Sequence, residues 1–145
     1  MITITRQITI AAEPPVIWRV LTDVERWPEW TPAVTSLEAL TTGGFAPQAR
    51  YRIKQPWLLP TLLTVELVDE GRRFLWATTS PGLRFEGDHL IEPANDGTAT
   101  VTLEARFTGV AGEVAGRLSR GLVQKYVTME AEGLKRRAEA YAKAT

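Results

Sequence analysis

His89 is the residue of this chain whose type and position best suit proton transfer. It is the only histidine among 145 residues, and imidazole is the side chain that most readily exchanges protons near neutral pH. The alternation of residues 83–92 places His89 on the same strand face as Phe85 and Ile91, which we expect to be the inner face. There it is a general acid or base, a hydrogen-bonding group for a ligand, or a buried histidine held by a backbone or tyrosine partner.

Tyr126 is the second candidate for chemistry. It lies in a long helical segment, and we expect it to face His89 across the space between that helix and the sheet. Together they form our candidate catalytic pair, whereas the alternative is that each only anchors the packing of helix on sheet. Asp88 does not complete a triad with His89, because neighbouring strand residues point to opposite faces.

Composition excludes several other kinds of site. The chain has no cysteine and one histidine, so it lacks thiol nucleophiles, disulfides and histidine-rich or thiolate zinc sites. No dinucleotide or phosphate-binding glycine motif is present either, and we expect no metal and no cofactor. Seventeen basic and seventeen acidic residues give a net charge of zero, which argues against a nucleic-acid partner.

The first ten residues alternate isoleucine and threonine instead of forming a signal sequence, and no apolar run is long enough to span a membrane. We therefore expect a cytoplasmic protein without an integral membrane segment, and either a monomer or a homodimer. The length fits a single domain that covers residues 1–145.

The apolar pattern predicts the elements that position these residues. Residues 2–10 alternate as a strand, a proline pair opens a helix over 14–22, and a second short helix follows over 23–31. Six further strands are predicted at 34–40, 49–55, 61–68, 74–79, 83–92 and 99–107. A long terminal helix is predicted at 111–142, with a buried stripe formed by Val114, Leu118, Leu122, Tyr126, Met129 and Gly133.

A single amphipathic sheet must bury its apolar face against another element. The predicted fold is therefore α+β, with a curved antiparallel sheet of about seven strands wrapped around the terminal helix. Trp27 and Trp30, after the first helix, are expected to close one end of this arrangement.

Four segments also resemble a known family. They are the stretch from Ala11 to Trp30, the residues Arg73, Phe74 and Trp76, the turn Asp96-Gly97-Thr98, and Gly133-Leu134-Lys135. This pattern resembles the START-like, or Bet v 1-like, helix-grip superfamily (SRPBCC), in its polyketide cyclase/dehydrase branch, over nearly the whole chain. The resemblance implies an elongated hydrophobic cavity between the sheet and the last helix. It does not imply one activity, because similar proteins include lipid carriers, hormone receptors, allergens, aromatases and cyclases.

We expect the cavity wall to be built from inward residues of the sheet and the terminal helix. The candidate ligand-binding residues are Tyr51, Ile53, Leu63, Val65, Phe74, Trp76, Phe85, His89, Phe107, Leu118, Leu122, Tyr126 and Met129. A separate group, Trp57, Leu58 and Leu59, lies on a proline-bounded loop and is expected to gate the cavity or contact a partner.

Three functions remain open from the sequence. The first is binding or carriage of a small hydrophobic molecule such as a lipid, an isoprenoid or an aromatic polyketide. The second is an enzyme, a polyketide cyclase or dehydratase that uses His89 and Tyr126 without a metal. The third is a partner-binding protein that uses the loop of Trp57 and holds no small ligand.

Overall fold

The computed structural model describes residues 1–144 and has the predicted α+β helix-grip architecture. Its elements in chain order are β1 (Ile2–Ile10), α1 (Pro14–Thr22), the 3-10 helix η1 (Val24–Glu29), β2 (Ser36–Ala39), β3 (Arg50–Lys54), β4 (Thr61–Asp69), β5 (Arg73–Ser80), β6 (Leu83–Pro93), β7 (Ala99–Thr108) and α2 (Val110–Ala144). Strand β2 is shorter at both ends than the expected strand over 34–40.

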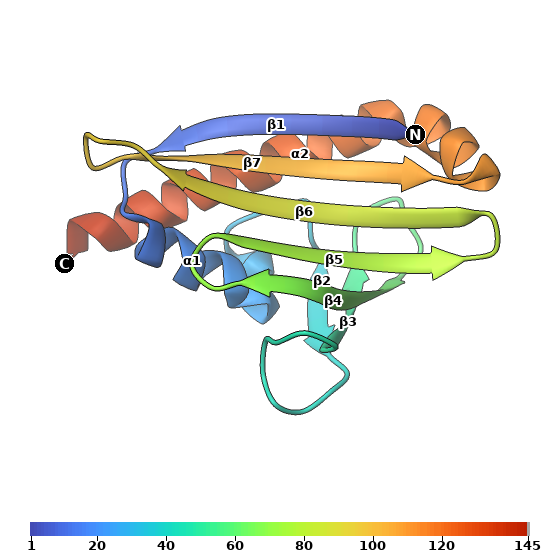
Figure 1. Ribbon diagram of the computed structural model, residues 1–145, viewed down its shortest axis with the longest axis horizontal. Helices are drawn as coiled ribbons and strands as arrows, with labels where there is room; N and C mark the ends of the chain where they lie inside the picture. Colours follow the sequence, from blue (N-terminus) through green and yellow to red (C-terminus); the bar gives the residue numbers. More distant parts are fainter. Residues whose placement is uncertain (145) are drawn as a thin grey trace.

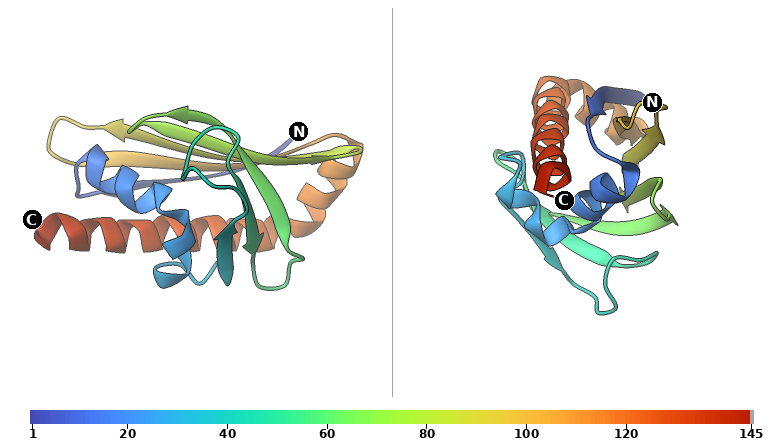
Figure 2. Two further views of the ribbon diagram at one scale, coloured as in Figure 1. Left: turned by 90° about the horizontal axis from the view of Figure 1, so that it is seen from below. Right: turned by 90° about the vertical axis from the view of Figure 1, so that its left-hand side faces the viewer.

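The seven strands form one antiparallel sheet in the order β1-β7-β6-β5-β4-β3-β2. Helix α2 runs behind this sheet in the view of Figure 1. Figure 2 shows the sheet curving around the helix, with α1 and η1 beside it, and the first turns of α2 set at an angle to the rest. The inner face of the sheet and one side of α2 therefore enclose a common interior.

The first helix and the turn after it seal one end of that interior. Helix α1 begins at Pro14, where a missing backbone N–H costs no intrahelical hydrogen bond. The Trp27 Nε1–H donates to the Leu21 carbonyl at 3.0 Å, which fixes its indole inside the fold. Gly133 of α2 lies against the backbone of Trp30, so closely that a Cβ at Gly133 would come within 2.1 Å of the Trp30 oxygen.

Strand β4 departs from simple alternation on the inner face. A register shift between Val65 and Leu67 interrupts its pairing with β5. Leu63 and Val65 are buried as expected, but Leu67 is exposed and Val68 packs against the core. A bulge of this kind places two residues of one strand opposite one of its partner, and the residues beyond it change face.

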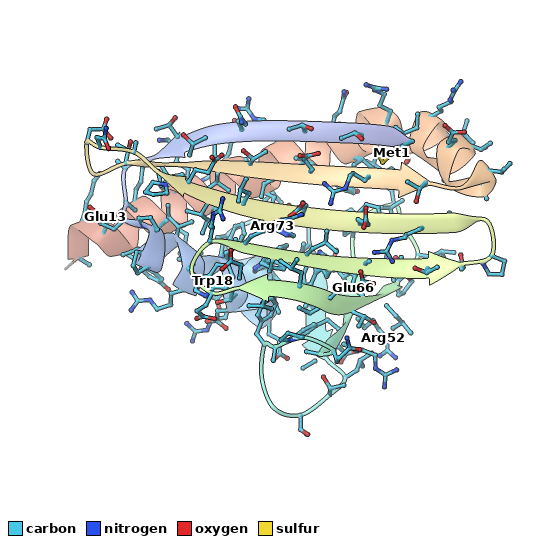
Figure 3. All side chains as sticks on the ribbon, viewed as in Figure 1. Met1, Glu13, Trp18, Arg52, Glu66 and Arg73 are labelled. Carbon is cyan, nitrogen blue, oxygen red and sulfur yellow. The ribbon has the colours of Figure 1, made fainter. Side chains whose placement is uncertain are left out.

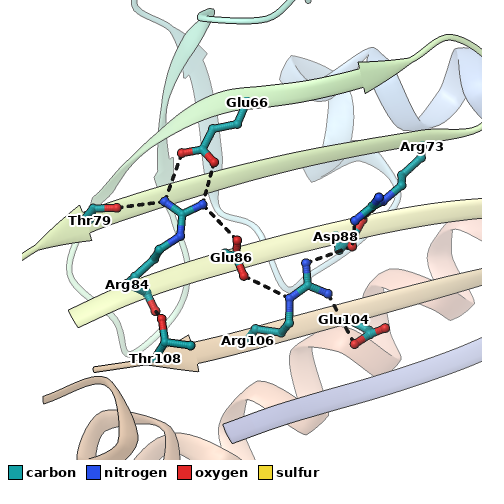
Figure 4. Close-up of polar contacts among 9 residues, drawn as sticks. All are labelled: Glu66, Arg73, Thr79, Arg84, Glu86, Asp88, Glu104, Arg106 and Thr108. Atoms are coloured by element: carbon teal, nitrogen blue, oxygen red, sulfur yellow. Dashed lines mark hydrogen bonds and ion pairs between the residues drawn. The ribbon is translucent and has the colours of Figure 1, made fainter. Parts of the chain in front are cut away.

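Charged side chains form a network on the outer face of the sheet, which faces the viewer in Figure 3. Figure 4 shows its chain of ion pairs, which runs through Glu66, Arg84, Glu86, Arg106, Asp88 and Arg73. Asp88 is the most buried member, and it accepts hydrogen bonds from Arg73 at 2.9 and 2.7 Å and from Arg106 at 3.0 Å. As predicted, it points away from His89, its neighbour in sequence.

Burial of the Asp88 carboxyl raises its pKa, but the hydrogen bonds from Arg73 and Arg106 outweigh burial, and the pKa lies below its ordinary value. Burial likewise raises the pKa of Glu86, and hydrogen bonds from Arg106 and Arg84 lower it to a net value below normal. The network therefore links strands β4 to β7 by charged groups that stay ionised at neutral pH.

Candidate functional site

A cavity of about 340 Å³ lies between the inner face of the sheet and α2. Its wall is largely apolar, from Trp27, Ile53, Leu58, Leu63, Trp76, Phe85, Leu103, Phe107, Ala115, Val123 and Val127. Its polar lining residues include Gln55, Thr61, Thr78, Ser119, Tyr126, His89 and Glu130. This combination of an apolar container with a few polar groups is typical of small-molecule sites, and the volume lies at the small end of their range.

Small residues keep the cavity open. On the α2 side, Ala115 and Ser119 stand where larger side chains would fill the space. On the sheet side, Gly87 lies beneath the Trp76 indole, and a Cβ at Gly87 would meet Trp76 Nε1 at 2.8 Å. Close packing in protein interiors otherwise leaves few voids larger than a water molecule. The small side chains of Ala115 and Ser119 and the absence of a side chain at Gly87 therefore leave space for a ligand.

His89 is held in the cavity wall by aromatic neighbours. Only 3% of the residue is exposed, and its ring stacks on Phe74 with centroids 3.9 Å apart and planes 10° apart. Edges of Trp27 and Trp76 contact it at centroid distances of 5.8 and 5.7 Å. His89 Nδ1 lies 3.3 Å from the Phe74 carbonyl oxygen, and because a carbonyl only accepts, Nδ1 is the nitrogen that carries a proton there.

Glu130 of α2 is the partner of His89 across the cavity. Its Oε1 lies 3.4 Å from His89 Nε2, which is ion-pair distance, and its side chain is 15% exposed. The same oxygen is buried and makes no hydrogen bond to any of residues 1–144, so the two groups are close without being aligned. With Nδ1 bound to Phe74, a neutral imidazole offers a lone pair at Nε2, and the carboxylate offers another. The pair accepts a proton between its members, or a hydrogen bond from a bound molecule.

Tyr126 lines the same cavity as His89, from the side of α2, as predicted. Its hydroxyl donates to the Pro56 carbonyl in the loop between β3 and β4. Burial raises the pKa of Tyr126, which keeps that hydroxyl protonated and able to donate. A catalytic role for Tyr126 with His89 stays a prediction, and Glu130, one turn after Tyr126, faces the same interior.

Seven of the thirteen candidate ligand-binding residues line the cavity: Ile53, Leu63, Trp76, Phe85, His89, Phe107 and Tyr126. Three more, Tyr51, Val65 and Phe74, are buried in the core but are not part of the cavity wall. In the predicted gate, Leu58 joins the wall, whereas Trp57 and Leu59 are exposed to solvent.

The remaining three candidates, Leu118, Leu122 and Met129, were placed on the wrong side of the terminal helix. Leu118 is 84% exposed, and Leu122 and Met129 are partly buried outside the cavity lining. The helix instead turns its small residues inward, and Gly116 packs so closely on Ile2 that a Cβ there would meet the Ile2 Cβ at 2.9 Å. Close approach to β1 thus decides the orientation of this part of α2.

Glu130 is a candidate site residue that sequence reasoning missed. A glutamate in a helix is expected at the surface, and only its spacing of four residues from Tyr126 indicated an inward position. Residues 1–144 contain no group of three or more side chains able to hold a metal ion together. None of the helices described is long and apolar enough to cross a membrane.

Comparison with known proteins assigns this chain to a family. The family model described as polyketide cyclase / dehydrase and lipid transport matches residues 1–139. A sequence comparison with curated proteins gave no match.

Solved structures share the fold at low sequence identity. TTHA0849 from Thermus thermophilus is 22% identical with a TM-score of 0.78, and the match covers 97% of this chain and 99% of that one. A START superfamily protein from Mycobacterium smegmatis is 15% identical with a TM-score of 0.68, over 99% of both chains. The di-domain ARO/CYC BexL from the BE-7585A biosynthetic pathway is 19% identical with a TM-score of 0.67, over 96% of this chain and 47% of that one.

Proposed function

This chain belongs to the polyketide cyclase/dehydrase and lipid transport family, and from that premise we propose that it binds one small, largely apolar molecule and recognises a hydroxyl group on it. The observation that carries the proposal is the buried histidine–glutamate pair in a largely apolar wall, with Glu130 Oε1 lacking a hydrogen bond among the described residues. A ligand hydroxyl supplies the donor that this oxygen lacks.

The energetic logic is that apolar burial gives affinity and the polar pair gives selectivity. Burying apolar ligand surface contributes about 25 cal/mol per Å². A hydrogen bond to a charged group adds about 1.5–3 kcal/mol, which corresponds to roughly ten- to hundredfold in affinity. A ligand without a hydrogen-bond donor leaves the Glu130 carboxylate buried and without a partner, which lowers the affinity for that ligand.

The test compares two probes of similar shape, 2-naphthol and 2-methoxynaphthalene, by isothermal titration calorimetry. Only 2-naphthol can donate a hydrogen bond, and we expect it to bind the protein at least about tenfold more tightly. Replacing Glu130 by Leu should remove that difference, because the variant has no carboxylate to accept the hydrogen bond or to be left without one. Glu132→Leu, an exposed position on the same helix, is the matched control. Equal affinities of the two probes for the wild-type protein would contradict the proposal.

A second candidate function is polyketide cyclisation or dehydration. It is favoured by the placement of an acid–base pair at a cavity wall, and by the fold shared with the ARO/CYC protein BexL. His89 would take a proton from a carbon between two ketones of a poly-β-ketone, and the protonated imidazole would return it to the carbonyl oxygen attacked by that carbon. Under this alternative, His89→Gln abolishes turnover of an offered poly-β-ketone and leaves binding of 2-methoxynaphthalene intact. Unchanged turnover in that variant would exclude it.

A further inference from the structure

The loop between β3 and β4 presents two large apolar side chains to water. Trp57 is 90% exposed and Leu59 is 86% exposed, while Leu58 between them points into the cavity wall. On soluble proteins, large exposed apolar patches mark interaction sites, whereas single exposed apolar residues do not. These two side chains lie directly beside a residue that lines the cavity.

This loop is held in place by specific hydrogen bonds. Lys54 Nζ donates to the Gln55 carbonyl at 2.8 Å and also to the Leu58 carbonyl, and the Tyr126 hydroxyl donates to the Pro56 carbonyl. Trp57 itself has a φ of +67°, in the left-handed region that bulky residues rarely occupy. Such backbone conformations persist where the surroundings impose them, and they gather at binding sites. The fold therefore holds the Trp57 side chain outward.

The first third of α2 carries a second set of exposed apolar side chains. Val110, Val114 and Leu118 follow one another at intervals of four, so they form one stripe along the helix. All three are exposed, Leu118 to 84%. Leu118 precedes Ser119, which lines the cavity, and the hydrogen bond from Tyr126 to Pro56 brings the loop against this helix. We call Trp57, Leu59, Val110, Val114 and Leu118 the apolar rim.

Positive charges accompany the apolar rim. Arg117, Arg120 and Lys125 are exposed and belong to none of the salt bridges among residues 1–144, although Arg117 lies near enough to Glu113 to help lower the pKa of that carboxyl. The one acidic residue in this part of α2, Glu113, is 2.9 Å from the N-terminal amine. The chain as a whole is neutral, so this end of the molecule holds a local cationic excess.

We propose that the apolar rim and its three cations dock the protein on an anionic phospholipid surface. An exposed apolar stripe flanked by basic residues is the pattern of helices that lie in the membrane interface, and tryptophan favours that boundary. A second copy of this chain fits the face less well, because a twofold contact uses the same patch on both copies and would bring two sets of positive charges close together. The proposal goes beyond ligand binding, because docking requires no molecule in the cavity.

The test is flotation of the purified protein with lipid vesicles. We expect it to float with vesicles of phosphatidylcholine and phosphatidylglycerol, to float far less with phosphatidylcholine alone, and to be released by high salt. The double variant Trp57→Ser/Leu118→Ser should reduce the partition coefficient at least about tenfold, and so should Arg117→Glu/Arg120→Glu. All four side chains are exposed, so the variants should keep the native fold, which circular dichroism checks.

Matched controls come from exposed residues elsewhere on the molecule. Leu67→Ser on the outer face of β4 and Arg136→Glu late in α2 should float as the wild-type protein does. Equal flotation with both kinds of vesicle, or no flotation at all, would overturn the proposal. So would a dimer in sedimentation velocity that the rim variants dissociate, because the face would then bind a second copy. The rim variants should still bind 2-naphthol, so failure of docking and failure of the proposed function are separate results.

Discussion

Gly87 shows how much of the candidate site depends on one missing side chain. Its replacement by Ala would place a Cβ 2.8 Å from Trp76 Nε1, and the indole would have to move. Because Gly87 and Trp76 both line the cavity, the movement reduces the space for a guest. We expect Gly87→Ala to weaken 2-naphthol binding at least several-fold and to lower the free energy of unfolding by about 1–3 kcal/mol. Calorimetry measures the affinity for 2-naphthol, and urea unfolding measures the stability. Unaltered 2-naphthol binding would contradict the conclusion that Gly87 keeps the cavity open.

Asp88 gives a prediction on pH. Its pKa is depressed in the folded protein, so the folded state binds its proton less readily than the unfolded chain does. The stabilisation is therefore present above the unfolded pKa of about 4 and is lost as the pH falls below it. We expect urea unfolding midpoints to decline from about pH 5 towards pH 2.

The matched variant Asp88→Asn removes the titrating group but keeps its shape. It should cost about 1–3 kcal/mol at neutral pH, since Arg73 and Arg106 each lose a charged partner. It should also show a shallower decline in acid than the wild-type protein. If the urea unfolding midpoint fell equally steeply with pH in both proteins, other carboxyl groups would govern the loss of stability in acid.

Two glycines of α2 respond oppositely to the same substitution. Gly133→Ala would drive a Cβ into the backbone of Trp30, whereas a Cβ at Gly121 meets nothing within 4 Å. We expect Gly133→Ala to destabilise the protein by about 1–3 kcal/mol through overpacking. Gly121→Ala should stabilise it by roughly 0.5–1 kcal/mol through helix propensity. Thermal unfolding followed by circular dichroism distinguishes them, and shifts of the same sign would refute the packing argument.

The strands were the part of the fold that the sequence predicted best. Alternation marks which side of a strand is buried, and it placed His89, Trp76 and Phe107 inward. It failed in β4 after Val65, because a bulge leaves no signature in apolar periodicity.

The face of the first part of α2 was predicted wrongly for a different physical reason, whereas Tyr126 and Gly133 of the predicted stripe are buried as expected. Periodicity follows large apolar side chains and assigns them to the interior. Here Val114 and Leu118 are outside, because Gly116 permits close contact with Ile2 and Ala115 leaves the cavity its space. Apolar periodicity assumes a filled core, so it predicts the buried face of a helix poorly where the helix borders a cavity. The same assumption places charged side chains at the surface, and for that reason Glu130 was missed.

At the scale of the whole molecule, one apolar cluster joins both ends of the chain. Residues from β1, α1, η1, all the later strands and α2 belong to it. We propose that the chain unfolds as a single domain, with one transition by near-ultraviolet and far-ultraviolet circular dichroism. Two separate unfolding transitions would show that parts of the chain unfold independently, and would contradict this proposal.

Ligand binding should shift that single transition. At a concentration of 2-naphthol about one hundred times its Kd, stabilisation is about 2.7 kcal/mol, which raises Tm by roughly 5–10 °C. Gly87→Ala should show a smaller rise at the same concentration. The absence of any rise with 2-naphthol would argue against binding in the cavity.

The positions of the tryptophans give the molecule two separate optical reporters. Trp27 and Trp76 line the cavity, and Trp57 is 90% exposed on the loop beside it. The emission of an exposed indole moves to shorter wavelength when the ring enters lipid, while a guest in contact with the buried rings quenches them. A Trp57→Phe protein thus reports by fluorescence on the cavity, and the difference from the wild-type spectrum reports on the surface. Occupancy and docking can then be followed in one unlabelled sample.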